Sequence, residues 1–227
     1  MPVLPKLVLV AGLGVGAKVL VGGWATVTIT NPPAYLESGQ SYRLEYMVRQ
    51  HGRDPLAGLS GTVELLPTGA APAGGPISVA ASAGSRQGSY VATFRVPEGD
   101  RLTLKIRSGF SGGGWGDLTV TGIPLVRRGE RAPVLSPADR GRQLFVMKGC
   151  VRCHVNGDLS ELPEENRVLE RGAAPELTGR KLEAAYVRQR LTDPASLPAI
   201  GPGPLRMPNL ELAPAEVDAL VAMLTGR

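Results

Sequence analysis

The residues best suited to chemistry lie in the sequence Cys150-Val151-Arg152-Cys153-His154, which holds both cysteines of the chain and one of its two histidines. Two thiols at this spacing, followed directly by a histidine, form the attachment sequence of a c-type haem. The thiols add across the two vinyl groups, and the imidazole binds the iron. The sequence therefore predicts one covalently attached haem c.

Other uses of two cysteines fit this chain less well. A disulfide between Cys150 and Cys153 would close a very small loop and gain little chain entropy. A zinc site usually needs a second pair of ligands, and His51 is the only other histidine. A thioredoxin-like redox pair needs a βαβ setting, which the sequence around the motif does not suggest. We expect His51 to be a loop or core residue, with metal binding as the alternative.

The composition favours turn-rich β structure over a long helical bundle. The chain has 227 residues, 30 of them Gly and 20 Pro, and only 4% aromatic residues. This length suits one large domain or two of about 100 residues each. The net charge of +5 is not clustered as in a nucleic-acid-binding protein, so we expect no nucleic-acid partner.

Residues 1–23 combine a basic residue with an apolar run, the pattern of an export signal. The run follows Lys6, is interrupted by Lys18 and ends before Trp24. It is short for a membrane-spanning helix, which needs about 20 apolar residues. We expect an uncleaved anchor, with a cleaved signal peptide as the alternative. Either places the rest of the chain on the extracytoplasmic (periplasmic) side of a membrane.

Residues 24–123 alternate between apolar and polar side chains, which predicts short strands separated by turns. The predicted strands are 25–30, 40–49, 61–66, 77–81, 89–96, 101–108 and 116–121. Such spacing is typical of an all-β immunoglobulin-like sandwich, here without the Cys…Trp…Cys pattern of antibody domains.

The segments 48–52, 55–59 and 88–90 of this region resemble small extracytoplasmic sandwich domains of the YtkA-like kind. Some domains of that kind handle copper or help to assemble respiratory complexes. We expect this domain to be a docking or spacer module. We expect Trp115 to close one end of this sandwich, with a partner-binding anchor as the alternative.

Residues 124–135 are polar and bounded by prolines, which indicates a linker. Ser136-Pro137 then matches a helix start, with Ser as the N-cap and Pro in the first turn. This helix is expected over 137–148, with further helices near 182–192 and from Pro214 onwards.

Residues 136–227 resemble the class I c-type cytochromes, with the C-x-x-C-H sequence at the end of the first helix. The resemblance implies an all-α cytochrome c domain in which Gly141 and Phe145 form the crossing with the last helix. Where many relatives have an aromatic residue near the end of that last helix, this chain has Met223-Leu224, which weakens the match at the crossing.

The resemblance also implies a methionine as the second axial ligand of the iron, on a loop shortly before the last helix and typically before a proline. Met207 precedes Pro208 and lies 53 residues beyond His154. A packing role is the alternative for Met207. Three methionines are weaker candidates for the ligand: Met47, Met147 and Met223.

Between the two ligands, the resemblance assigns three supporting residues. The carbonyl of Pro175 would accept a hydrogen bond from His154, and Leu177 would pack on the haem. Arg180 would pair with a haem propionate, with a plain surface cation as the alternative. The partly acidic stretch 155–172 is expected to be a solvated loop, or else a recognition loop for a basic partner.

The predicted fold class is therefore multidomain: an N-terminal transmembrane or signal segment, an all-β immunoglobulin-like sandwich and an all-α cytochrome c domain. The predicted function is that of a membrane-associated monohaem cytochrome c, without enzyme activity. It would be a one-electron carrier, or a relay subunit of a respiratory or photosynthetic membrane complex, with redox proteins as partners. Two alternatives stay open: a structural or assembly subunit that docks through the sandwich, and a haem sensor.

Overall fold

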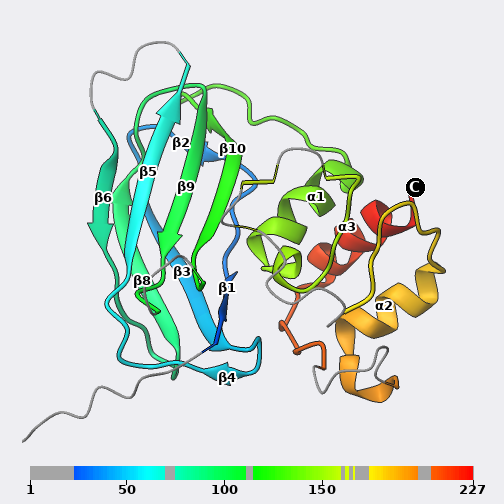
Figure 1. Cartoon of the computed structure of the whole chain (residues 1–227). Coiled ribbons are helices and arrows are strands. Elements are labelled where there is room, and N and C mark those ends of the chain that lie inside the picture. Colours follow the sequence, from blue (N-terminus) through cyan, green and yellow to red (C-terminus); the bar gives the residue numbers. More distant parts are fainter. Residues whose placement is uncertain are drawn as a thin grey trace, which may run out of the picture.

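The computed structural model describes residues 23–69, 75–110, 115–159, 162–163, 166, 174–198 and 206–226. In these residues two β-sheets pack face to face, and three α-helices lie along one side of them (Figure 1). The predicted anchor or signal segment, residues 1–23, falls outside the described residues except for Gly23. Among the described helices, none combines the length and the apolar character needed to cross a membrane.

The first sheet has the order β1 (Ala25–Ile29), β3 (Ser41–Gln50), β8 (Ser89–Arg95) and β7 (Ser82–Ala83), with β4 (Asp54–Pro55) also paired to β3. The second sheet has the order β2 (Leu36–Glu37), β10 (Leu118–Val126), β9 (Arg101–Arg107), β5 (Thr62–Thr68) and β6 (Ile77–Ala80). The pairings are antiparallel except for β2 with β10.

The core between the sheets follows from the alternation in the sequence. In β9, Leu102, Leu104 and Ile106 point inward, while the residues between them are partly exposed. Buried side chains from both sheets form one cluster, which includes Val27, Leu44, Val63, Phe94, Leu104 and Val120. Burial of this apolar surface is the main stabilisation of the two sheets.

The seven strands predicted from the alternation are confirmed to within about two residues, apart from the end of β10. This strand runs to Val126, so the first residues of the predicted linker belong to the sheet. No pattern in the sequence predicted β2, β4 and β7, which have two residues each. Trp115 is 49% exposed, and its backbone carbonyl accepts a hydrogen bond from the Ala25 N–H at the end of the sandwich.

The predicted helices are also present. Helix α1 (Pro137–Met147) begins after Ser136, whose hydroxyl accepts a hydrogen bond from the Asp139 N–H at 3.1 Å. Helices α2 (Ala184–Thr192) and α3 (Pro214–Thr225) follow, with the short 3-10 helices η1 (Cys150–Arg152) and η3 (Pro194–Ser196).

The predicted fold class, with a membrane or signal segment, an immunoglobulin-like sandwich and an all-α cytochrome c domain, is wrong. The described part of the chain is mostly β-sheet, and no separate all-α domain is evident in it. The physical reason is that the helices do not complete a core by themselves. Met147 of α1 is fully buried in the core of the sandwich, and Val146 packs against both this core and the smaller helical core.

Residues from the C-terminal half of the chain form hydrogen bonds with β1 in the first sheet and with β10 in the second. The Thr28 hydroxyl in β1 donates to the Lys148 carbonyl at 3.3 Å. In β10, the Asn166 side-chain amide accepts from the N–H of Thr119 and donates to its carbonyl. The Asn166 contacts supply the Thr119 backbone groups with partners that they would otherwise take from water or from another chain.

Candidate cofactor site

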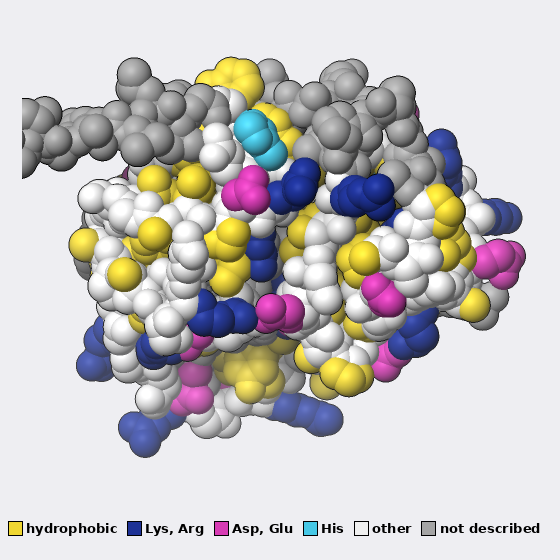
Figure 2. Space-filling model, turned by 90° about the horizontal axis from the view of Figure 1, so that it is seen from below, with side chains coloured by type: hydrophobic (Ala, Val, Ile, Leu, Met, Phe, Trp, Pro, Cys, Tyr) yellow, Lys and Arg dark blue, Asp and Glu magenta, His cyan; other side chains and the backbone are white. Residues whose placement is uncertain are grey.

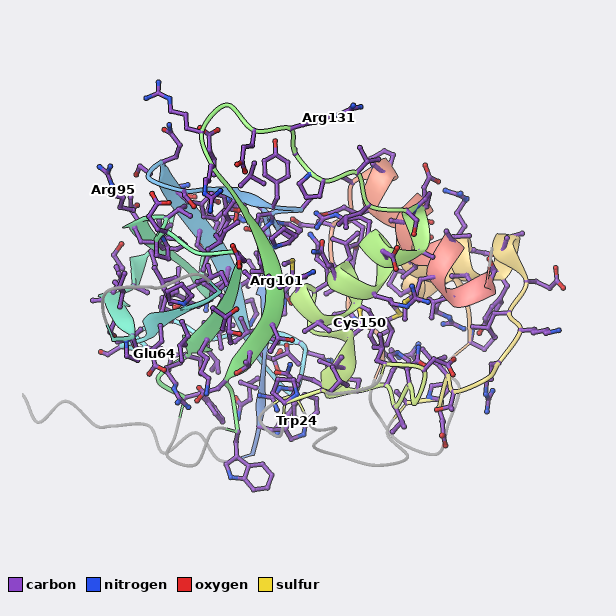
Figure 3. The ribbon with its side chains drawn as sticks, turned by 90° about the horizontal axis from the view of Figure 1, so that it is seen from above. Trp24, Glu64, Arg95, Arg101, Arg131 and Cys150 are labelled. Carbon is purple, nitrogen blue, oxygen red and sulfur yellow. The ribbon has the colours of Figure 1, made fainter. Side chains whose placement is uncertain are left out.

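The C-x-x-C-H sequence lies at the junction of the helices and the sandwich. Helix α1 ends at Met147 with Lys148 as its C-cap, and Gly149 then adopts a left-handed conformation with φ of 78°. A Cβ atom at Gly149 would lie 2.5 Å from the carbonyl oxygen of Val27 in β1, so only glycine fits this close approach. Figure 3 shows Cys150 at this inner end of α1, on the side facing the sheets.

One tight turn holds the two cysteines and the histidine together. The Cys150 carbonyl accepts hydrogen bonds from the N–H groups of Cys153 at 3.1 Å and His154 at 2.9 Å. Neither cysteine is part of a disulfide. The Cys150 side chain borders a cavity but is surrounded by protein atoms, and this burial raises the pKa of its thiol to about 12.

The imidazole of His154 has a fixed orientation. Its Nδ1 donates a hydrogen bond to the carbonyl oxygen of Pro175 at 2.9 Å, because a carbonyl can only accept. The Leu177 N–H in turn donates to the Val155 carbonyl at 2.8 Å, which holds the segment carrying Pro175 beside the motif. Burial lowers the pKa of His154, and the bond to Pro175 opposes this only in part. The neutral ring therefore has its Nε2 lone pair free for a metal.

All seven residues predicted for the site line one cavity of about 190 Å³: Cys150, Cys153, His154, Pro175, Leu177, Arg180 and Met207. A single water needs only about 10–15 Å³, so this cavity holds a far larger group. Its walls are largely apolar, with Phe145, Leu182, Val187, Leu191, Leu220 and Leu224 among the lining residues. Such a cavity with few polar groups is typical of a cofactor site.

Among the four methionines that the structure describes, Met207 alone lines this cavity. Met47 and Met147 are buried in the sandwich core or beside it. Met223 lies at the crossing of α1 and α3, against Gly141. The geometry thus separates Met207 from the three rivals that the sequence left open.

The sandwich supplies a wall of the cavity that the sequence did not indicate. The wall consists of Thr26 and Thr28 of β1 with His51 and Gly52 of the turn after β3. His51 is half-buried with φ of 48°, and its ring packs edge-on against Trp24 with centroids 5.6 Å apart. No local pattern signals such a wall, because it forms only when β1 packs against the turn after α1.

Three arginines also line the cavity. Arg190 donates to the backbone carbonyls of Pro194, Leu197 and Pro198, so it holds the start of the loop that leads towards Met207. Arg180 and Arg206 are exposed at the rim. Seen from below, basic and acidic side chains lie along the junction between the sandwich and the helices (Figure 2).

The donor set suits a haem c. It offers two thiols at the attachment spacing, a neutral imidazole with a free Nε2 and a thioether on the same cavity. Within the described ranges, no group of three or more His, Cys, Asp and Glu side chains is placed to hold a metal ion.

No model of a known protein family matches the chain, and no curated protein matches it either.

Proposed function

We propose that this chain holds one haem c and transfers single electrons. The observation that carries the proposal is the grouping of Cys150, Cys153, His154 and Met207 around one largely apolar cavity. The thiols would form the thioether links, and the haem, when bound, supplies a one-electron change between Fe(II) and Fe(III).

His154 and Met207 would both bind the iron of the haem. The Pro175 carbonyl fixes the tautomer and the orientation of the His154 ring. The soft thioether of Met207 favours ferrous iron and so raises the reduction potential above that of a bis-histidine site. With His154 and Met207 both bound to it, the iron would have no place for a substrate, which favours a carrier over an enzyme.

Two further residues of the cavity support the same proposal. Leu177 is half-buried and packs with the helical core, so it excludes water from one side of the site. Arg180 lies exposed at the rim, where its guanidinium would pair with a haem propionate. On the side of the sandwich, the cavity is closed by the wall that contains Thr26, Thr28 and His51.

We also propose an extracytoplasmic (periplasmic) location, with attachment to the membrane through residues 1–23. The support is the sequence, in which Lys6 precedes the apolar run. In this location the protein would be a carrier or a relay subunit that exchanges electrons with redox proteins of a respiratory or photosynthetic membrane complex.

Haem attachment is tested by producing the full chain in cells that attach c-type haem, beside the double variant Cys150→Ala/Cys153→Ala. The native chain is expected to keep one haem through denaturing electrophoresis, to gain the mass of one haem and to show a reversible one-electron couple. The double variant should lose the covalent haem. A native chain without covalent haem would overturn the proposal, and rapid binding of CO to the ferrous native protein would favour a sensor.

A further inference from the structure

A buried ion pair lies beside the cofactor cavity. The Nζ atom of Lys148, at the end of α1, is 2.8 Å from Oε1 of Glu216 in the first turn of α3. Their side chains are only 2% and 15% exposed. The second carboxylate oxygen of Glu216 accepts a hydrogen bond from the Ala213 N–H at 2.9 Å, so both oxygens have partners.

The sandwich contacts the Lys148 end of this pair. The Thr28 hydroxyl of β1 donates to the Lys148 carbonyl, and the Lys148 Nζ lies 3.5 Å from the Thr30 carbonyl, to which it donates. The same Lys148 lines the cavity together with Cys150, two residues further along the chain. The charge of Lys148 also acts on the Cys150 thiol, where it favours the ionised form.

A second cation lies close to the pair. Arg140 donates to the carbonyls of Pro32 and Pro33, in the segment that follows β1, and its charge interacts with that of Glu216. Glu216 is therefore a carboxylate between two cations, Lys148 and Arg140. Loss of the carboxylate would leave both positive charges uncompensated beside the cavity.

We propose that the Lys148–Glu216 pair sets the reduction potential of the haem site and that the sandwich acts as the wall that shields the pair from water. This rests on the proposed haem function. Charges removed from water act over longer distances because the protein interior screens them weakly. A cation without its partner carboxylate would disfavour the extra positive charge of ferric iron and so raise the reduction potential. A carboxylate without its partner cation would favour that charge and so lower the potential. Burial and local charge are among the means by which proteins tune a haem.

The proposal predicts shifts of opposite sign. In Glu216→Gln, which keeps the shape of the side chain, the potential should rise. In Lys148→Met it should fall, and in the double variant it should return towards the native value. The measurement is a redox titration of each purified haem protein at neutral pH, with Lys148→Arg as the variant that changes the shape and keeps the charge.

A matched control is the pair Arg188–Asp218, which joins α2 to α3 at 2.7 Å but is 50% and 63% exposed. Arg188→Met and Asp218→Asn make the same changes of charge at positions exposed to water, so the reduction potential should shift much less in these two variants. Shifts of the same sign in the two buried variants, or shifts no larger than those of the controls, would overturn the inference.

Folding is followed for each variant by thermal unfolding, because a buried charge without its partner destabilises a protein. If Lys148→Met does not fold, Glu216→Gln alone still tests the proposal. The reduction potential of Glu216→Gln must rise by more than that of Asp218→Asn. Failure of the proposed function is a separate result: a native chain without covalent haem overturns both proposals, whereas a native haem protein whose variants do not shift overturns this one alone.

Discussion

Gly141 of α1 lies directly against the backbone of Ala219 in α3. A Cβ atom at Gly141 would be 2.3 Å from the Ala219 carbonyl oxygen and 2.6 Å from the Cβ of Met223. Two helices approach this closely only where one of them has no side chain. The crossing therefore fixes where α3 lies relative to the C-x-x-C-H turn at the end of α1.

Replacement of Gly141 by Ala should destabilise the protein. The overpacking costs about 1–3 kcal/mol, and the backbone clash places it at the upper end, whereas the better helix propensity of Ala returns only about 1 kcal/mol. Chemical unfolding measures the difference. Arg142→Ala on the exposed face of α1 is the control, since its ion pair with Asp139 is worth about 0.5 kcal/mol or less. A Gly141→Ala variant more stable than the native protein would show that the helices do not cross as described.

Replacement of Met207 by Ala should lower the reduction potential and open one axial position of the haem. The half-buried thioether lines the cavity, and in the proposed haem protein its removal would leave the iron without the ligand that favours the ferrous state. The expected readouts are loss of the weak red absorption band of a methionine–iron bond and rapid binding of CO to the ferrous protein.

Met223→Leu is the matched control for Met207, because Met223 lies outside the cavity at the helix crossing. This variant should keep the native spectrum and exclude CO. An unchanged spectrum in Met207→Ala, or a lost band in Met223→Leu, would show that the axial ligand is assigned to the wrong methionine.

Asn166 is expected to hold its segment to the edge of β10. Its side chain is fully buried and bonds both the N–H and the carbonyl of Thr119, as a neighbouring strand would. Asn166→Ala leaves two buried backbone groups without partners, at a cost of about 1–3 kcal/mol for each unsatisfied group. Thermal unfolding and hydrogen exchange at the Thr119 amide measure the loss.

Asn31 provides a control with the same pair of bonds in water. Its amide donates to the Arg43 carbonyl at 2.7 Å and accepts from the Glu45 N–H at 2.8 Å, at an exposed position. Water replaces these partners in Asn31→Ala, so its loss of stability should be clearly smaller. Equal losses in the two variants would mean that burial does not strengthen the Asn166 contacts.

The sequence predicted the parts of the site that are local in the chain. The Cys150–His154 turn places its own thiols and imidazole, whereas Met207 was predicted only through the resemblance of its segment to the class I c-type cytochromes. Long-range packing set the rest: Thr28 and Lys148, 120 residues apart, meet only in the folded chain. The same limit explains the wrong fold class. The resemblance implied that Gly141 and Phe145 of α1 face the last helix, but it could not show that Met147 of the same helix is buried in the core of the sandwich.

The segment after Met207 is held to the sandwich by an ion pair between Arg86 and Glu211, 2.7 Å apart. The hydrogen bond from Arg86 and its positive charge lower the pKa of the Glu211 carboxyl. Because the pKa is lower in the folded state than in the unfolded chain, the contact stabilises the fold above about pH 4.3, the ordinary value for Glu. This stabilisation is lost as the pH falls through the lowered folded value.

Acid should therefore loosen the segment that carries Met207, and Glu211→Gln should remove this dependence. Both partners are more than half exposed, so the pair is worth about 0.2–1 kcal/mol, or at most about a fivefold change in opening. The measurement is the hydrogen-exchange protection factor of the Glu211 amide, whose N–H bonds the Asn209 side chain at 2.9 Å. Arg127→Gln, in the exposed pair with Glu130, is the control and should keep the native response to acid. If Glu211→Gln loses protection in acid as steeply as the native protein, another carboxylate controls this segment.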